Sequence, residues 1–369
     1  MDQLMFILFL IIFLPVFLIS IFIPYWTRKT ESFGVSIPEE IYHTPKLKNM
    51  RRRFATGTGI VSILTSIIFF ILSGLLGTTE QSLSILFSIL LIVFLIASFL
   101  IYLKFHSEMK AMKKKENWAK EKSQQVFINT NFREQKLTYS NFWFVIPIVI
   151  AIIMIFIAFQ AYQQIPNRIP IKFNFNGEIT NWAEKSYRSV LLHPIMMIYL
   201  TFLFFFINVT ISKAKQQIDP NNPESSIKKN IMFRKRWSAY TIASSYALTI
   251  LFSINHLSLI YPIEPYVLSI TSMIITGIIV IGAVILSITT GQGGSRIKDY
   301  QIGNGSVINR DDDKYWKLGI FYFNREDPAL FLEKRFGVGW TINLARPLAW
   351  IIFTAIIGIA FALPFFLGS

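Results

Sequence analysis

Eight long apolar runs divide this chain, and each holds about 20 residues or slightly more. A helix of that length spans the roughly 30 Å hydrocarbon layer of a bilayer. The runs lie at approximately 5–25, 55–77, 83–103, 143–164, 189–211, 238–257, 266–289 and 347–367. An apolar content of 53%, with 35 Phe, also lies outside the range of soluble globular proteins. The sequence therefore predicts an all-α integral membrane protein with about eight transmembrane helices.

The positions of the basic residues predict the orientation of these helices. Of 36 Lys and Arg residues, 32 fall in the four segments 26–54, 104–141, 212–237 and 290–346. Basic loops resist translocation, so these segments are expected inside, next to anionic lipid head groups, with both chain termini outside. The remaining four basic residues share one outer segment: Arg168, Lys172, Lys185 and Arg188. Because the net charge of +15 is spread over separate loops, no nucleic-acid partner is expected.

This pattern gives five regions in chain order. They are 1–142 (helices one to three), 143–211 (helices four and five with an outer motif loop, 165–188), 212–289 (helices six and seven), a cytosolic element at 290–346, and 347–369 (helix eight). A duplication of four helices plus four is an open alternative, because similar basic segments, 49–54 and 231–237, precede helices two and six.

Two loops have local patterns that predict structure. In the outer loop, residues 170–175 alternate faces over their second half, Asn176-Gly177 is a hairpin turn signal, and residues 179–182 are the expected return strand. A hairpin this small is expected to pack on helix ends. The cytosolic element is expected to contain β-structure at residues 315–323, a turn at 324–328 and a helical turn around 330–332.

Two further inner segments have predicted roles. Residues 108–122 form a charged stretch that predicts a solvated or membrane-surface helix. Residues 291–294, which are rich in glycine, are expected to end helix seven with a flexible exit.

The sequence contains few groups with recognisable chemistry. It has no cysteine, which excludes disulfides and thiol catalysis. His193, His256 and Glu264 could meet at the outer surface, but no ligand spacing supports a metal site, and no cofactor is expected. Asp311, Asp312 and Asp313 are expected to form a solvated turn or to pair with the neighbouring Arg310 and Lys314. The middle of each apolar run lacks ionisable residues, which disfavours an ion-coupled transporter.

Three segments resemble a known family. Residues 33–40 resemble the first inner loop of SdpI-like membrane proteins of Gram-positive bacteria. Residues 165–174, with Gly177, Trp182 and 185–186, resemble the associated outer domain of unknown function, in which His is common at the position of Lys172. Residues 311–337 resemble a second uncharacterised C-terminal domain. The resemblance implies a multi-pass protein of the bacterial cytoplasmic membrane. The best-understood members confer immunity to a secreted peptide toxin, and one recruits a cytosolic repressor.

These observations lead to three functional hypotheses. The first is a non-enzymatic protein that senses or neutralises an extracellular antimicrobial peptide or envelope stress, with a possible cytosolic regulator as partner. Its candidate outer contacts are Arg168, Lys172, Phe173, Asn174, Phe175, Asn176, Gly177, Trp182 and Lys185. Its candidate cytosolic contacts are Asp311, Asp312, Asp313, Trp316, Phe321, Tyr322, Glu333 and Arg335. The alternatives are a transporter or membrane enzyme using His193, Asn255 and His256, and a structural partner of another membrane complex.

Overall fold

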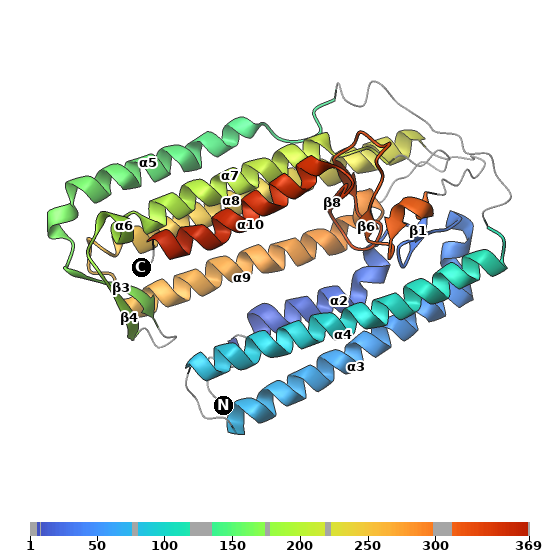
Figure 1. Ribbon diagram of the computed structural model, residues 1–369, viewed down its shortest axis with the longest axis horizontal. Coiled ribbons are helices and arrows are strands. Elements are labelled where there is room, and N and C mark those ends of the chain that lie inside the picture. The colour runs from blue at the N-terminus through green and yellow to red at the C-terminus, as the bar shows by residue number, and fades with distance from the viewer. Residues whose placement is uncertain are drawn as a thin grey trace. The chain divides into compact units, whose positions relative to one another are not determined.

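The chain forms two compact units, each assembled from separated stretches of sequence (Figure 1). The computed structural model describes residues 6–7, 9–75, 80–118, 135–173, 178–217, 223–297 and 312–367. Unit 1 contains Met1–Gln135, Ala214–Phe233 and Val284–Arg346, and unit 2 contains Lys136–Lys213, Arg234–Ala283 and Pro347–Ser369.

Unit 1 joins three apolar helices to a group of short strands. Its helices are α2 (Leu14–Trp26, after a π-helical turn at Phe9–Phe13), α3 (Pro45–Leu75) and α4 (Glu80–Lys115), together with the start of α8 (Pro223–Leu257) and the end of α9 (Pro265–Thr290). Its strands are β1 (Glu31–Ser32), β2 (Val35–Ser36), β5 (Trp316–Lys317), β6 (Phe321–Tyr322), β7 (Phe331–Glu333) and β8 (Trp340–Ile342). Short 3-10 turns cover Glu39–His43, Gln292–Gly294 and Asp313–Tyr315.

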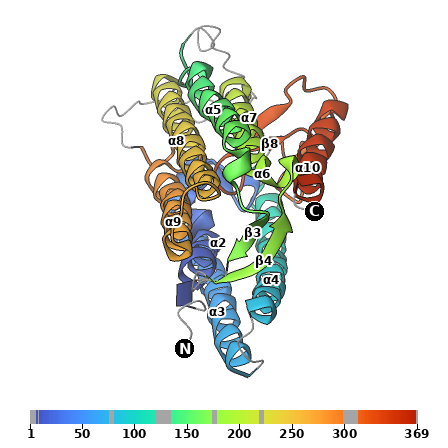
Figure 2. The same cartoon turned by 90° about the vertical axis from the view of Figure 1, so that its left-hand side faces the viewer.

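Unit 2 is a helical unit that carries one hairpin. It contains α5 (Val145–Gln160, after a 3-10 turn at Asn141–Phe144), α6 (Tyr187–Val190), α7 (Leu192–Lys213), α10 (Pro347–Leu367) and the remaining parts of α8 and α9. A 3-10 turn at Tyr162–Gln164 leads into the hairpin of β3 (Arg168–Phe173) and β4 (Ile179–Glu184), and Figure 2 shows these two strands side by side.

Six helical stretches in the described part of the chain are long and apolar enough to cross a membrane. They are Phe9–Trp26, Pro45–Leu75, Gln81–Lys115, Asn141–Gln160, Leu192–Lys213 and Pro265–Gly294. The other two predicted runs fall within α8 and α10. Within α10, the apolar stretch Pro347–Ala362 has fully described residues. Hydroxyl side chains lower the mean hydropathy of α8. Four of them are buried: Ser238, Thr241, Ser245 and Thr249.

The apolar helices of unit 1 pack through aromatic and hydroxyl side chains. Phe13 of α2 lies 5.3 Å from Phe69 of α3 and 4.6 Å from Phe87 of α4, measured between ring centroids. On α3 the buried Ser62 hydroxyl donates to the Thr58 carbonyl at 2.9 Å, so it needs no partner on another helix. Small polar residues let helix backbones approach closely in lipid, where apolar burial alone gives little driving force. Large apolar side chains such as Ile63 stay exposed, as lipid-facing residues do.

The C-terminal element of unit 1 is β-structured, as predicted. β5 pairs with β6 and β7 pairs with β8, and a bridge between Tyr322 and Asn343 joins the two hairpins. The buried Asn343 amide donates to the carbonyls of Asn324, Asp327 and Ala329. The helical turn predicted around residues 330–332 is wrong. This stretch forms β7, because its strand partner β8 follows within ten residues, and three apolar residues carry no helical periodicity of their own.

The charged stretch predicted to be helical at 108–122 is helical as far as Lys115, where it forms the end of α4, and residues 119–134 lie outside the described part. Lys110, Lys114 and Lys115 are exposed, as predicted. Lys113 is not solvated: it is 9% exposed and pairs with Asp313. The predicted end of α9 is confirmed at Thr290, but the exit is an ordered joint, since the buried Gln292 side chain makes two hydrogen bonds to the Gly339 backbone.

The predicted hairpin is confirmed: β3 begins two residues before the predicted first strand, and β4 ends two residues after the predicted return strand. Arg168 lies opposite Glu184 and Phe173 opposite Ile179. The hairpin is anchored by the buried Ile169, which belongs to a cluster that also contains Val190 and Leu259. The Asn176-Gly177 turn lies outside the described residues.

Replacing Phe54 with Ala is expected to destabilise unit 1 by about 3 kcal/mol, the range for a buried Phe. The Phe54 ring is 2% exposed and lies within 5.5 Å of the rings of Phe33 and Phe105. Thermal unfolding in detergent micelles measures the change. Ile63→Ala on the same helix, where the side chain is 62% exposed, is the control, expected to shift stability by less than about 0.5 kcal/mol. Equal losses in both variants would contradict this packing.

Candidate functional site

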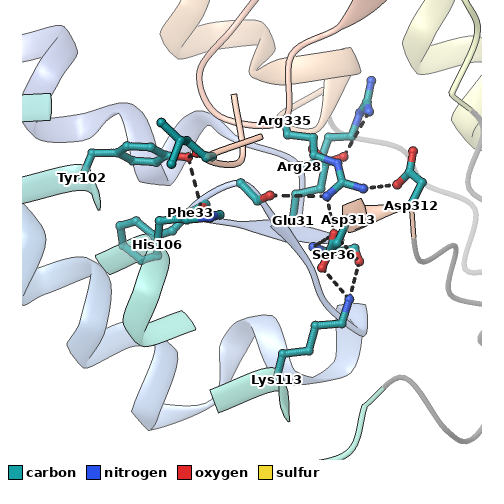
Figure 3. A network of polar contacts seen from close by, with 12 residues as sticks. Arg28, Glu31, Phe33, Ser36, Tyr102, His106, Lys113, Asp312, Asp313 and Arg335 are labelled. Atoms are coloured by element: carbon teal, nitrogen blue, oxygen red, sulfur yellow. Dashed lines mark hydrogen bonds and ion pairs between the residues drawn. The ribbon is translucent and has the colours of Figure 1, made fainter. Parts of the chain in front are cut away.

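A set of charged and polar side chains in unit 1, here called the ionic network, joins four separate stretches of sequence (Figure 3). They come from the loop after α2, the end of α4, the start of α8 and the C-terminal element. The members are Arg28, Glu31, Ser36, Lys113, Asn230, Asp312, Asp313, Glu333 and Arg335.

Arg335 is the centre of the network. Its side chain is 1% exposed and forms ion pairs with both Asp312 and Asp313. It also donates to the Gly34 carbonyl at 3.3 Å, and its guanidinium carbon lies 5.0 Å from the centroid of the Trp316 ring. A planar guanidinium suits this arrangement because it donates in several fixed directions at once. Figure 3 shows Arg335 pointing at the two carboxylates.

Asp313 links Arg335 to the first inner loop and to α4. One carboxylate oxygen accepts hydrogen bonds from the Ser36 amide at 3.1 Å and hydroxyl at 3.0 Å. The other oxygen lies 2.7 Å from the Lys113 ammonium, which also donates to the Ser36 hydroxyl at 2.8 Å. The position of β2 is therefore fixed by a residue 277 positions later in the chain.

Glu333 forms the second branch of the network. It is fully buried, pairs with Arg28 and accepts a hydrogen bond from the Asn230 amide at 2.8 Å. Gly293 lies against this pair: a Cβ there would come within 2.8 Å of the Arg28 Nε and 3.0 Å of the Glu333 carboxylate. With a φ of 60°, this position favours glycine for its conformation as well as for its space.

Glu31 is the least satisfied carboxylate of the network. It is 7% exposed, lies 3.7 Å from Arg28, and one of its oxygens accepts no hydrogen bond in the described structure. Burial raises the pKa of the Glu31 carboxyl, and the neighbouring charges of Arg28 and Arg335 do not cancel that rise.

A second ion pair lies elsewhere in the same unit. Asp327 accepts from the Lys215 ammonium at 2.5 Å and from the Tyr322 hydroxyl at 2.8 Å. Burial raises the pKa of the Asp327 carboxyl, but these donors, with the Ala329 amide, outweigh burial and leave the pKa below its usual value. This pair holds the segment before α8 to the C-terminal element.

Most of the predicted cytosolic contacts are therefore internal. Glu333 and Arg335 are buried, and Trp316 and Tyr322 pack together with a ring distance of 5.0 Å. Phe321 is exposed. The sequence predicts Asp312 and Asp313 in a solvated turn or as partners of Arg310 and Lys314; the structure shows both in ion pairs with Arg335, and Asp313 also with Lys113. Asp311 and Arg310 lie outside the described residues.

The sequence interpretation missed the partners of these residues. Five residues contact the C-terminal element from at least 103 positions away in the chain, and no local pattern marks them: Arg28, Ser36, Lys113, Asn230 and Lys215.

The outer candidates are described only in part. Arg168 and Trp182 are exposed, and the Trp182 side chain is 49% exposed. Lys185 is used internally, since its ammonium donates to the Ile165 carbonyl at 2.8 Å and lies 4.9 Å from the centroid of the Tyr162 ring. Lys172 and Phe173 lie on β3, but nothing is described of their side chains. Asn174, Phe175, Asn176 and Gly177 lie outside the described residues.

The two outer histidines do come together in unit 2. The rings of His193 and His256 lie 6.2 Å apart, and the His256 Nε2 bonds to the Met154 carbonyl at 3.1 Å. Asn255 does not join them, because its amide donates to Leu251 of its own helix. Among the described residues, no group of three or more His, Cys, Asp or Glu side chains could hold a metal ion.

Replacing Arg335 with Met is expected to destabilise the protein by about 3–5 kcal/mol, because two partly buried carboxylates lose their shared partner. Thermal unfolding in detergent micelles measures the loss. The control is Lys46→Met, which also removes one positive charge but breaks an exposed pair with Glu116, with an expected loss below about 1 kcal/mol. A loss for Arg335→Met no larger than that of the control would contradict a structural role.

Replacing Glu31 with Gln is expected to stabilise the protein at neutral pH and to have no such effect in acid. A raised pKa in the folded state favours protonation, so the stability it contributes is lost as the pH rises through that pKa. The variant stays neutral and avoids this loss. Unfolding midpoints measured from acidic to neutral pH should therefore converge in acid and separate above the usual pKa of Glu. Glu40→Gln, at an exposed position, controls for the lost charge, and a constant offset for Glu31→Gln would refute the assignment.

Comparison with known proteins identifies two domains without an assigned role. Residues 149–198 match the model of a family described as a domain of unknown function (DUF1648), and this stretch contains β3 and β4. Residues 325–350 match a family of unknown function (DUF5808), which covers β7, β8, Asp327, Glu333 and Arg335. No curated protein and no solved structure matches the chain. The chain is thus a helical, apolar protein whose β3–β4 hairpin and β7–β8 hairpin each fall within an uncharacterised domain.

Proposed function

We propose that this chain is a non-enzymatic multi-pass membrane protein that binds an extracellular peptide through the β3–β4 hairpin, and thereby gives immunity to, or senses, an antimicrobial peptide or envelope stress. The observation that carries the proposal is the hairpin itself: a two-stranded sheet that keeps both outer edges unpaired within the described sheet and carries an exposed Trp182. An unpaired strand edge can accept a peptide as an added strand.

The proposed topology places this hairpin outside. Eight helices, counting α8 and α10 with the six that are long and apolar by themselves, put the four basic segments on the inner face and both termini outside. In this arrangement the DUF1648 segment faces the medium and the DUF5808 segment faces the cytoplasm. The membrane is then the cytoplasmic membrane of a bacterium, and a Gram-positive host follows from the SdpI-like resemblance.

The hairpin offers suitable chemistry for a peptide. Trp182 is a large, half-exposed aromatic side chain of the kind that anchors binding interfaces. Arg168 is an exposed cation on the paired strand, opposite Glu184 and two residues before Pro170, the cross-strand partner of Trp182, and Lys172 lies on the same strand. Together they favour a ligand with apolar side chains and a carboxylate.

The ionic network supports a structural role for the C-terminal element and leaves ligand binding to the β3–β4 hairpin. Because Asp312, Asp313, Glu333 and Arg335 pair with one another and with other segments, they maintain the fold of the inner element. Recruitment of a cytosolic regulator stays a separate prediction, and these four residues are not evidence for it.

One observation favours the alternative of a transporter or membrane enzyme. His193 and His256 are neighbours in unit 2, as that hypothesis requires, although Asn255 is engaged with its own helix. The remaining alternative, a structural partner of another membrane complex, would be tested by co-purification.

A strain without the gene tests the proposal when it is complemented with variant proteins. Arg168→Gln combined with Lys172→Gln is expected to insert normally and to raise sensitivity to a panel of antimicrobial peptides on the order of tenfold, since two charged contacts contribute roughly 1–2 kcal/mol together. Inhibitory concentrations measure the effect.

The matched control is Lys235→Gln combined with Arg236→Gln. It removes the same charge from exposed positions on the predicted inner side, and it should protect as well as the wild type. Unchanged sensitivity of the deletion strain to the whole panel would refute the peptide function. Full protection by the hairpin variant would refute the role of the two basic residues.

A further inference from the structure

The β5–β6 hairpin sits at a defined depth along α4. The Tyr102 hydroxyl donates to the Leu318 carbonyl in the turn at 2.8 Å, and a Cβ at Gly319 would lie 2.7 Å from the His106 ring. Tyr102 is near the end of the apolar run 83–103, and Lys104 begins the charged part of the helix. The turn therefore lies where α4 passes from apolar to charged sequence, which is the membrane surface if α4 spans the bilayer.

A second contact holds the element at the same level. The ring of Phe336 lies 4.5 Å from the ring of Tyr102, and Gly337 lies against Ile23 of α2. Since two separate loops meet the same turn of α4, the hairpin has little freedom to move away from this level.

The hairpin has one buried face and one exposed apolar face. Trp316 and Tyr322 lie opposite each other and are buried, so Lys317 and Phe321, the next cross-strand pair, point the other way. Leu318 is 47% exposed, Phe321 44% and Phe323 40%. Large apolar side chains clustered on one face of a small element mark an interaction surface.

The same part of the element is rimmed by positive charge. Lys314, Lys317 and Arg325 are exposed in the described structure. Aromatic and apolar side chains bordered by basic residues are typical of segments that lie in the interface of an anionic bilayer, where the rings enter the head-group region and the cations meet lipid phosphates.

We propose that the β5–β6 hairpin is an interfacial anchor for anionic lipid. Leu318, Phe321 and Phe323 enter the boundary between head groups and acyl chains, and Lys314, Lys317 and Arg325 contact the phosphates. This role is independent of any peptide bound by the outer hairpin, and it holds for either orientation of the chain in the membrane.

Site-specific fluorescence can test the anchor because the chain has no cysteine of its own. The full-length protein is labelled with an environment-sensitive dye at Phe321→Cys and reconstituted into vesicles of phosphatidylcholine containing phosphatidylglycerol. The dye at 321 is expected to emit at shorter wavelength and to be quenched severalfold more by lipids with brominated acyl chains than a dye at Glu326→Cys, an exposed control position on the same element.

Removing the charges tests the phosphate contacts. Lys314→Gln combined with Lys317→Gln is expected to reduce quenching at 321 in vesicles with phosphatidylglycerol, with little change in phosphatidylcholine alone. Both sites are exposed, so the fold should survive, and thermal unfolding verifies it. A dye at 321 that is as water-exposed as the one at 326 would overturn the proposal and leave the face open to a protein partner. Equal quenching with and without phosphatidylglycerol would overturn the lipid-phosphate contact.

Discussion

The burial of one arginine constrains unit 1 more than any other single interaction. An unpaired buried guanidinium is far costlier than an exposed one, so the Arg335 side chain requires Asp312 and Asp313 beside it. Asp313 in turn fixes Ser36 and Lys113, and Arg335 itself bonds to the backbone at Gly34. Gly34 has a φ of 76° and leaves no room for a Cβ, since one would lie 2.5 Å from the Gly319 carbonyl. These stretches must therefore assemble together, because the charged side chains of the C-terminal element take partners from the first loop and from α4.

The features that could be predicted are those encoded within one short stretch. A run of 20 apolar residues forms a helix whatever surrounds it, and helices occur at every predicted run. The outer hairpin carries its own alternation and its own turn signal, so both strands were predicted. The ionic network has no local signal: Ser36 and Asp313 are 277 residues apart, and Lys113 and Asp313 are 200 apart. Proximity in the sequence suggested Lys314 as a partner of Asp313, whereas in the fold Asp313 pairs with Lys113.

α8 is not among the six described helices that are apolar enough to span a membrane by composition, although one of its faces is buried. α8 carries serine and threonine along a buried face, and two of these hydroxyls bond to carbonyls of the same helix: Thr241 to Trp237 at 2.7 Å and Thr249 to Ser245 at 2.8 Å. Such residues lower the hydropathy of a helix without exposing an unsatisfied polar group. The polar contacts of Asn208 with Asn141 and Ser238 are likewise satisfied inside unit 2, at 2.7 and 2.6 Å. The hydropathy of a sequence counts these polar groups against a helix. Only the structure reveals the hydrogen bonds that satisfy them.

In the proposed topology, the basic residues of the inner segments have two roles that act at different times. Topology is set as the nascent chain inserts, before tertiary ion pairs exist, so Arg28 and Lys113 can direct orientation first and be buried against carboxylates later. The same reasoning applies to the four basic residues of the predicted outer segment. Lys185 is held by the Ile165 carbonyl and the Tyr162 ring, which gives it a structural reason to be there. The proposal of a specific outer ligand therefore rests on the β3 residues Arg168 and Lys172. Among the described side chains it rests on the exposed Arg168 of β3 and the exposed Trp182 of β4.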